Sequence, residues 1–445
     1  MAQIVGERIM TDLFDQPRAF PYYDESASYV TVGGRFRQWE HSGWKAESLS
    51  WKNSCYIHTG LSGPVVCIDG PDADKFIAWL CTNSLKNFPE GVMRHAVMCK
   101  DDGLIAAHGI LQRYDNGMYR HFAAGPWALY KGMTGDFNVR VWMEDMYLSQ
   151  IAGPRSLEAL QRASGEDLSD IAFLRYRTTT IAGKTVEVGR IGMSGNLAYE
   201  VRGPIEDGPA VYDAIYQANR EIGIERLGWR TYLVNHVEGG FPQQGWTFGL
   251  GQSYDPGFRK WIGEDHFALH GQRTGSYDPA DNRARQRTPF EVNWGSAVRF
   301  NHDFLGREAL EKAAQSPDQR RTVTLRWNAE DVIDIYASLY QQGEEYRTMD
   351  LPTTPPWSHG MLEHADRILK DGKLVGISSG SIYSYYFREN LSMGCIDEEL
   401  ATPGTELIVQ WGDFGRRIKD VRVTVDQFPY LTAERNSDVS PATTA

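Results

Sequence analysis

Cysteine is scarce in this chain of 445 residues, and the cysteines that occur are scattered. The five cysteines are odd in number and widely spaced, which argues against a disulfide framework and against a zinc site. The sequence also lacks a run of about eighteen apolar residues that could span a bilayer. Its first residues have neither the basic start nor the apolar stretch of a secretory signal. We therefore expect a cytoplasmic protein that holds no metal and inserts into no membrane.

Positive charge is also in short supply. The 46 basic residues are outnumbered by 58 acidic ones, and the formal net charge is -12. Such a balance disfavours nucleic acids and anionic membrane surfaces as partners. An anionic ligand would have to be bound by local arginines, and the composition does not indicate an oligomeric state.

Most self-contained catalytic motifs are missing as well. The sequence has no Gly-x-Gly-x-x-Gly after a strand, no phosphate-binding loop, no Cys-x-x-Cys and no His-Glu-x-x-His. These absences argue against nicotinamide, flavin, nucleotide and zinc chemistry.

A recurring unit of strand, Gly-Pro step and helix is what the sequence does contain. It occurs at residues 65–84, 148–165 and 198–223. Hairpin patterns such as "VEVGRIGMSGNLAYEV" separate the units. Together they predict an α+β protein with helices on one face of mostly antiparallel sheets.

The pattern of predicted helices and strands changes towards the C-terminus. Residues 249–290 are rich in Gly, Asp, Arg and Gln, and they predict a long irregular connection. From about residue 320 the chain becomes a series of short alternating strands with few helical runs, which predicts a separate β domain. The polar residues 433–445 predict a disordered tail.

Five segments resemble, in order, the landmarks of the glycine-cleavage aminomethyltransferase superfamily. They are "WKNSCYIHTGLSGPVVCIDGPDADKFIAWL", "KDDGLIAAHGIL", "GRIGMSGNLAYEVRGP", "LGWRTYLVNHVEGGFP" and "NHDFLGREAL". The likeness extends from about residue 28 to residue 432. Within the superfamily the sequence is most similar to tetrahydrofolate-dependent aryl ether O-demethylases of the vanillate and syringate type. It also resembles the enzyme that opens the methylenedioxy rings of the lignan sesamin.

The resemblance implies a fold. It is a three-domain cloverleaf, in which two ferredoxin-like domains and a C-terminal jelly-roll-like β domain surround a central folate channel. We expect a discontinuous folate-binding domain of residues 28–60 and 150–290, and a second domain of residues 61–149. Residues 291–432 would form a connection and the C-terminal β domain.

The resemblance also implies a tetrahydrofolate site. The acid that matches Glu200 binds the amino-pyrimidine edge of the pterin, and a carboxylate suits this task because it accepts two parallel N–H donors. Arg190 and Met193 flank the same turn and are assigned to the cofactor. Phe241 stands where the demethylases carry a tryptophan and is expected to stack on the pterin. The alternatives are a surface acid at Glu200 and a plain core aromatic at Phe241.

Three residues are candidates for catalysis. The tyrosine that matches Tyr232 assists one-carbon transfer in the O-demethylases, and a phenol of pKa about 10 can donate to a departing phenolate with little mismatch. His58 and His121 could supply an acid or a base, and buried structural roles are the alternative for all three. Arg230 and Glu238, in the same stretch as Tyr232, are expected to form an ion pair.

Departures from the family pattern bear on the substrate. Thr59 stands where the family carries an aspartate, and the arginine of the demethylases aligns with His121, next to Arg120. Because side chains alternate along a strand, Arg120 and His121 cannot both face the channel. In the demethylases this arginine and a histidine bind the carboxylate of the substrate, and the loss of both favours a neutral substrate. Trp127 and Trp246 are expected to line an apolar substrate pocket.

We therefore expect a tetrahydrofolate-dependent transferase that acts on a small aromatic ether. A methylenedioxyphenyl substrate resembling sesamin would give 5,10-methylene-tetrahydrofolate, and a methoxyphenyl substrate would give 5-methyl-tetrahydrofolate. The alternatives are an O-demethylase of aromatic acids, a sulfonium demethylase and a non-catalytic folate-binding accessory protein. The accessory proteins carry a Lys-Gly-Cys motif where this chain has "VEGGFP".

Overall fold

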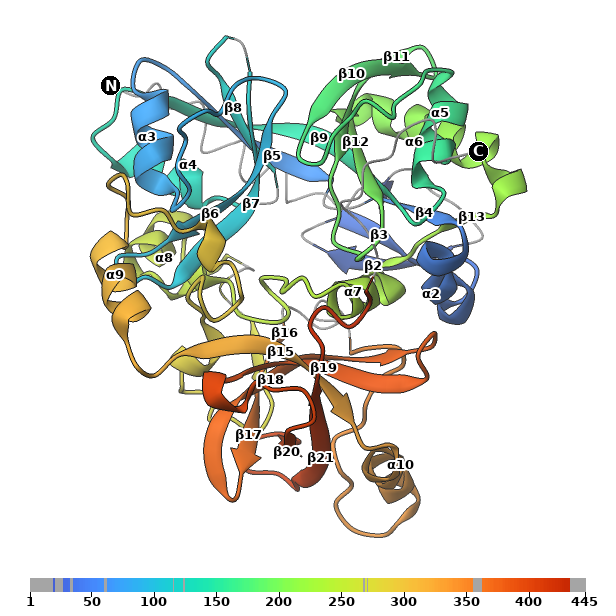
Figure 1. The fold of residues 1–445 in the computed structure, drawn as a ribbon, viewed down its shortest axis with the longest axis vertical. Coiled ribbons are helices and arrows are strands. Elements are labelled where there is room, and N and C mark those ends of the chain that lie inside the picture. The colour runs from blue at the N-terminus through green and yellow to red at the C-terminus, as the bar shows by residue number, and fades with distance from the viewer. Residues whose placement is uncertain are drawn as a thin grey trace.

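The computed structural model describes residues 19–20, 27–32, 35–59, 62–114, 116–122, 125–266, 269, 271–354 and 362–432. Two α+β lobes lie side by side above a β barrel (Figure 1). The predicted tail at residues 433–445 falls outside the described residues. No helix within these ranges is long and apolar enough to cross a bilayer.

One ten-stranded sheet runs through both lobes. Its longest strand, β9, pairs with β5 through its first half and with β12 and β4 through its second half. The two lobes are therefore parts of one sheet and not two separate ferredoxin-like sheets. All its pairs are antiparallel except β13 with β4. In sheet order the strands are β10 (Tyr176–Ile181), β11 (Lys184–Arg190), β12 (Ala198–Pro204), β9 (Arg140–Ala152), β5 (Gly63–Asp69), β8 (Tyr119–Phe122), β7 (Ile105–Arg113) and β6 (Met93–Cys99), with β4 (Cys55–His58) and β13 (Ile224–Arg226) beside β9.

Helices cover one face of each half of this sheet. The predicted strand-to-helix units are confirmed, because β5 leads into α3 (Ala73–Leu80), β9 into α5 (Ser156–Ser164) and β12 into α6 (Gly208–Ala218). The helices bury their apolar residues against the sheet in two separate cores. The opposite face of the sheet is left free to form the walls of a site.

The predicted irregular connection at residues 249–290 contains regular elements. Its helix α8 (Pro256–Ile262) packs beside α4 (Trp127–Thr134), and its strand β14 (Gln272–Thr274) pairs with β16 (Leu362–His364). The prediction missed α8 because the helix is short and its one buried residue, Phe258, meets aromatic side chains from another part of the chain.

A closed barrel of six strands forms the C-terminal part. The predicted β domain is thus confirmed, although a jelly roll would have eight strands in two sheets. Asp371 and Gly372 both have positive φ in the β17–β18 turn, as a type I′ hairpin requires. Around the barrel the order is β15 (Arg320–Trp327), β19 (Glu389–Asp397), β18 (Lys373–Ser384), β17 (Asp366–Lys370), β20 (Glu406–Trp411) and β21 (Lys419–Asp426).

Helix α7 (Trp229–Glu238) lies where the lobes meet the barrel (Figure 1). Its apolar residues share a core with Trp51 of α2 (Trp44–Asn53) and with Ile382 and Leu391 of the barrel. The helix therefore joins the parts of the molecule. The remaining elements are β1 (Ala19–Phe20), β2 (Ser28–Val32), β3 (Arg35–Glu40), α9 (Arg307–Gln315), α10 (Ala329–Ala337) and the 3-10 turns at 205–207, 220–222, 251–254, 283–285, 295–297, 338–340 and 398–400.

Candidate functional site

A row of three polar side chains crosses the uncovered face of the sheet. Gln150 on β9 is in register with His58 on β4 and with Glu200 on β12. Residues directly opposite one another on neighbouring strands project from the same face. The backbone pairing therefore brings together three residues that are far apart in sequence.

The Glu200 carboxylate is buried and firmly held. Gln150 Nε2 donates to Glu200 Oε1 at 3.2 Å, and Arg202 forms an ion pair with the other carboxylate oxygen. Arg202 also donates to Gln112, and its guanidinium lies 4.3 Å from the ring centroid of Phe122. Gln150 Oε1 is buried and accepts no hydrogen bond from the described residues. Two oxygen acceptors, one charged and one neutral, thus lie side by side.

These acceptors open onto a mostly apolar cavity between the sheet and the α7 segment. Glu200 is its one charged residue among the described residues that line it, and they include no lysine or arginine. The predicted residues Met193 and Phe241 contribute to the wall. The full lining is His95, His108, Gly109, Ile110, Phe122, Leu148, Gln150, Phe173, Leu174, Ile191, Gly192, Met193, Glu200, Phe241 and Gln243.

Two histidines form the wall that β6 and β7 provide. His95 Nε2 and His108 Nδ1 are 3.1 Å apart, which makes one ring the donor and the other the acceptor. The Trp294 ring lies 4.6 Å from the centroid of His95 and 4.7 Å from that of His108. Burial lowers the pKa of His95 to about 4 and that of His108 well below its ordinary value. Both rings are therefore neutral at pH 7.

Tyr232 and His58 lie directly behind the cavity wall. Their rings stack with centroids 4.1 Å apart, and the Tyr232 hydroxyl donates to Met193 Sδ at 3.2 Å. His58 Nδ1 lies 2.7 Å from the carbonyl oxygen of Leu227, so this nitrogen carries the proton. Burial lowers the pKa of His58 to about 3 and raises the pKa of Tyr232 well above 10. Both groups are neutral, and the tyrosine contacts Met193, which lines the cavity.

Arg190, His121 and Thr59 lie outside the cavity. Arg190 is in register with Tyr199, so it projects from the face opposite to Glu200. His121 pairs in register with Val66 and Leu111 and faces the helix-covered core. Thr59 is buried just after β4 and lines no part of the cavity.

Arg120 projects from the same face of β8 as the cavity residue Phe122. Of Arg120 and His121, it is therefore Arg120 that lies on the cavity side of the strand. It does not line the cavity, because its guanidinium pairs with Glu144 at 2.9 Å and with Glu187 at 3.7 Å. The positive charge is thereby neutralised on the protein itself.

The two tryptophans assigned to the substrate lie elsewhere. Trp127 begins α4 and is fully buried against Tyr130 and Phe258. Trp246 packs in the core around α7, close to Gly380 of the barrel. Large aromatic residues are as useful in a core as in a pocket, and the sequence alone does not distinguish the two.

Sequence reasoning missed Gln150 and the pair His95 and His108. A usable signal existed, since "IAAHGILQR" alternates in such a way that His108, Ile110 and Gln112 share one face of a strand. The partner histidine lies on another strand, and only the β6–β7 register joins the two.

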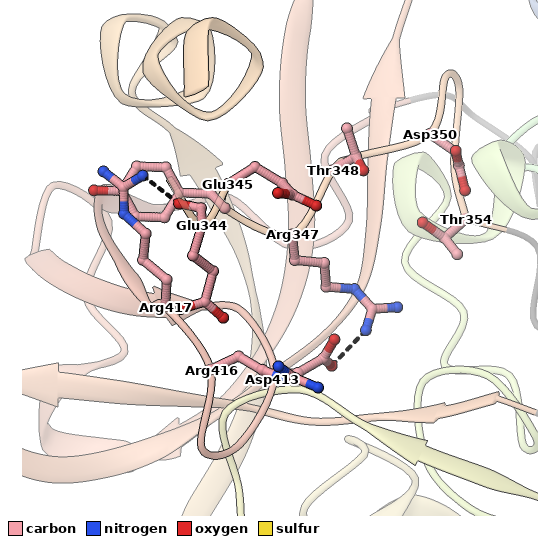
Figure 2. Close-up of a pocket in the computed structure, with 10 residues that line it drawn as sticks. Glu344, Glu345, Arg347, Thr348, Asp350, Thr354, Asp413, Arg416 and Arg417 are labelled. Carbon is pink, nitrogen blue, oxygen red and sulfur yellow. Dashed lines mark hydrogen bonds and ion pairs between the residues drawn. The ribbon is translucent and has the colours of Figure 1, made fainter. Parts of the chain in front are cut away.

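A second hollow lies on the surface of the barrel (Figure 2). Arg347 pairs with Asp413 there, and Arg417 donates to the backbone carbonyl oxygen of Glu344 at 2.6 Å. It contains no histidine among the described residues that line it. The chemistry-bearing side chains gather instead in the cavity beside Glu200.

Known proteins resemble this chain over nearly its whole length. It is 38% identical over 437 residues to the sesamin methylene transferase of Sinomonas sp. (strain No.22), which covers 94% of this chain and 96% of that protein. It is 31% identical over 392 residues to the syringate O-demethylase of Sphingobium sp. (strain NBRC 103272 / SYK-6), and this alignment covers 84% of this chain and 83% of that protein.

The fold has a solved counterpart. The crystal structure of glycine cleavage system aminomethyltransferase T from Bartonella henselae superposes with a TM-score of 0.65 at 16% identity, covering 92% of this chain and 95% of that chain. The model of the GCVT N-terminal domain matches residues 10–248. The chain therefore belongs to the GCVT aminomethyltransferase family and is a tetrahydrofolate-dependent one-carbon transferase.

Proposed function

We propose that this protein removes a one-carbon unit from a neutral aromatic ether and transfers it to tetrahydrofolate, releasing a catechol or a phenol. The observation that supports this most directly is the composition of the cavity. Its described walls are mostly apolar and aromatic, and they carry no lysine or arginine. An uncharged aromatic substrate is therefore favoured over an anionic one.

The cavity also fits the pterin of tetrahydrofolate. Glu200 and Gln150 Oε1 would accept its N–H groups, and the buried acceptor of Gln150 would thereby gain a partner. Met193 and Phe241 would cover the faces of the ring. When bound, tetrahydrofolate supplies the amine that takes up the one-carbon unit.

A methylenedioxyphenyl compound such as a sesamin-like lignan is our first substrate, and a methoxyphenyl compound is the second. Methoxylated aromatic acids rank below both. Their carboxylate would need a cation, but Arg202 is paired with Glu200, and Arg120 is paired with Glu144 and Glu187.

The test is an anaerobic incubation of the protein and tetrahydrofolate with sesamin, guaiacol, vanillate, syringate or dimethylsulfoniopropionate, followed by mass analysis of the folate. We expect sesamin to add a methylene bridge to the folate and to yield a catechol. A methyl group gained from guaiacol alone would assign demethylation of neutral ethers.

The other substrates make the test decisive. Turnover of vanillate or syringate in preference to the neutral ethers would contradict the proposed neutral substrate. A methyl group gained only from dimethylsulfoniopropionate would assign a sulfonium demethylase. Folate binding without consumption of any donor would assign an accessory protein.

A further inference from the structure

We propose that His108 is a catalytic residue that donates a hydrogen bond, and then a proton, from Nε2 to the leaving oxygen of the ether, and that His95 is the positioning residue that sets its tautomer. This inference rests on the proposed function. It assigns a role to two side chains of β6 and β7 that line the same cavity as the folate-binding acceptors.

The geometry isolates this pair from the other titratable groups. Of the described residues that line the cavity, only Glu200, His95 and His108 can titrate. Glu200 is occupied by Arg202 and Gln150. Tyr232 is not among the residues that line the cavity, and its hydroxyl donates to Met193 Sδ. The pair is therefore the remaining source of a proton inside the cavity.

The contact between the two rings fixes the protonated nitrogen of His108 once the donor is chosen, and the donor that we propose is His95. When His95 Nε2 donates to His108 Nδ1, across 3.1 Å, the proton of His108 must reside on Nε2. This Nε2 makes no hydrogen bond with the described part of the chain. Phe241, Phe248 and Trp294 surround the His108 ring and keep it dry, which strengthens any hydrogen bond it makes.

The proposed step balances in atoms and charge. For one carbon–oxygen bond of the ether, the bond would break with its electron pair left on oxygen, while the bound cofactor would supply the amine that takes the carbon and gives up one proton. The oxygen would take the proton of His108 Nε2, and His108 Nδ1 would take the proton of His95 Nε2. His95 Nδ1 would take up the proton that the amine gives up. Both rings begin and end neutral, so no buried charge is created.

The test compares variants across a series of methylenedioxybenzenes whose ring substituents, from nitro to methoxy, change the pKa of the departing catechol. His108→Phe keeps the ring and removes the donor. We expect its kcat to fall by about 10² to 10³ on the unsubstituted compound and by less than about tenfold on the nitro compound. His108→Gln, whose amide can still donate near the Nε2 position, should recover part of the loss.

Two further variants separate positioning from mere support. His95→Gln retains a hydrogen-bond donor to His108 Nδ1 but cannot pass a proton on, so it should keep the affinity of the folate-free protein for catechol and lose kcat, whereas His95→Leu should lose both. Tyr232→Phe tests the competing assignment of the proton donor to Tyr232. We expect its fall in kcat to be equal on every compound of the series. Equal losses for His108→Phe on every compound, or a leaving-group dependence that appears in Tyr232→Phe instead, would overturn the inference.

A measurement without folate keeps this inference distinct from the proposed function. Catechol is titrated into the folate-free protein while tryptophan fluorescence is recorded, since Trp294 adjoins the pair. We expect His108→Phe to bind catechol at least about tenfold more weakly than the wild type, as the loss of a hydrogen bond in a dry site implies. Equal affinities would overturn the contact with His108 even if turnover is observed. Absence of turnover of every ether by the wild type would instead refute the proposed function.

Discussion

The buried ion pair of Glu200 and Arg202 joins the stability of the protein to folate binding. Replacing Glu200 by Gln removes the charged acceptor that we assign to the pterin, so folate affinity should fall by about 10- to 100-fold. The same change leaves Arg202 buried without its partner, which should lower the free energy of unfolding by about 3–5 kcal/mol. Isothermal titration with tetrahydrofolate and urea unfolding measure the two effects.

A double variant separates these two effects. Glu200→Gln with Arg202→Met removes both charges, and the free energy of unfolding should return most of the way to the wild-type value. Folate affinity should remain low, because the carboxylate is still missing. Recovery of folate affinity in the double variant would mean that Glu200 only supports the sheet.

Single residues were predictable from sequence where one short motif contained them. Glu200 and Met193 belong to one hairpin, and both line the cavity. Gln150 and His108 were missed because their importance comes from pairing with other strands. Strand register is a non-local property, so it is invisible in a motif.

At the scale of elements, α7 is fixed to its neighbours by a buried carboxylate at its end. Glu238 accepts hydrogen bonds from Trp51 Nε1 at 3.1 Å and from Ser384 Oγ at 2.6 Å, and it pairs with Lys52. The prediction of an ion pair between Arg230 and Glu238 is wrong, because Arg230 pairs with Glu40 of β3 instead. Arg230 and Glu238 are thus attached to different elements, which orients the helix that leads into the cavity residues Phe241 and Gln243.

Glu238→Gln should therefore loosen the junction of α2, α7 and the barrel. Lys52 would be left buried without a counter-charge, and burial already lowers its pKa to about 8. We expect a loss of about 3–5 kcal/mol in the free energy of unfolding, measured by urea denaturation. Combining Glu238→Gln with Lys52→Met should restore much of that loss. If the single variant is as stable as the wild type, the pair does not fix the helix.

At the scale of the whole molecule, the sequence predicted the types of element better than their connection. The strand-to-helix units and the β character of the C-terminal part follow from local patterns, and both are confirmed. The single sheet through both lobes depends on β9 being 13 residues long and on its two ends finding different partners. Local patterns do not specify which strands pair, so they did not reveal this sheet.

Four buried histidines and the half-buried His95 make the stability of the whole molecule depend on pH. Burial lowers the pKa of His58 and His121 to about 3, that of His95 and His236 to about 4, and that of His108 well below its ordinary value. In the unfolded chain a histidine titrates near pH 6.5. Below about pH 6.5 the unfolded chain therefore binds more protons than the folded one, and the free energy of unfolding must decrease as the pH falls.

The window between about pH 7 and pH 5.5 isolates this effect, because most carboxylates titrate only below it. Urea unfolding across the window should give a free energy that is highest at pH 7. It should decline with a slope that approaches about 1.4 kcal/mol per pH unit for each buried histidine as the pH falls below 6.5. His121→Asn removes one of the five histidines at a position outside the cavity, on the opposite face of β8 from Phe122, so its slope should be smaller by about one histidine's share. A free energy of unfolding that stays constant across the window would contradict the burial of these rings in a neutral state.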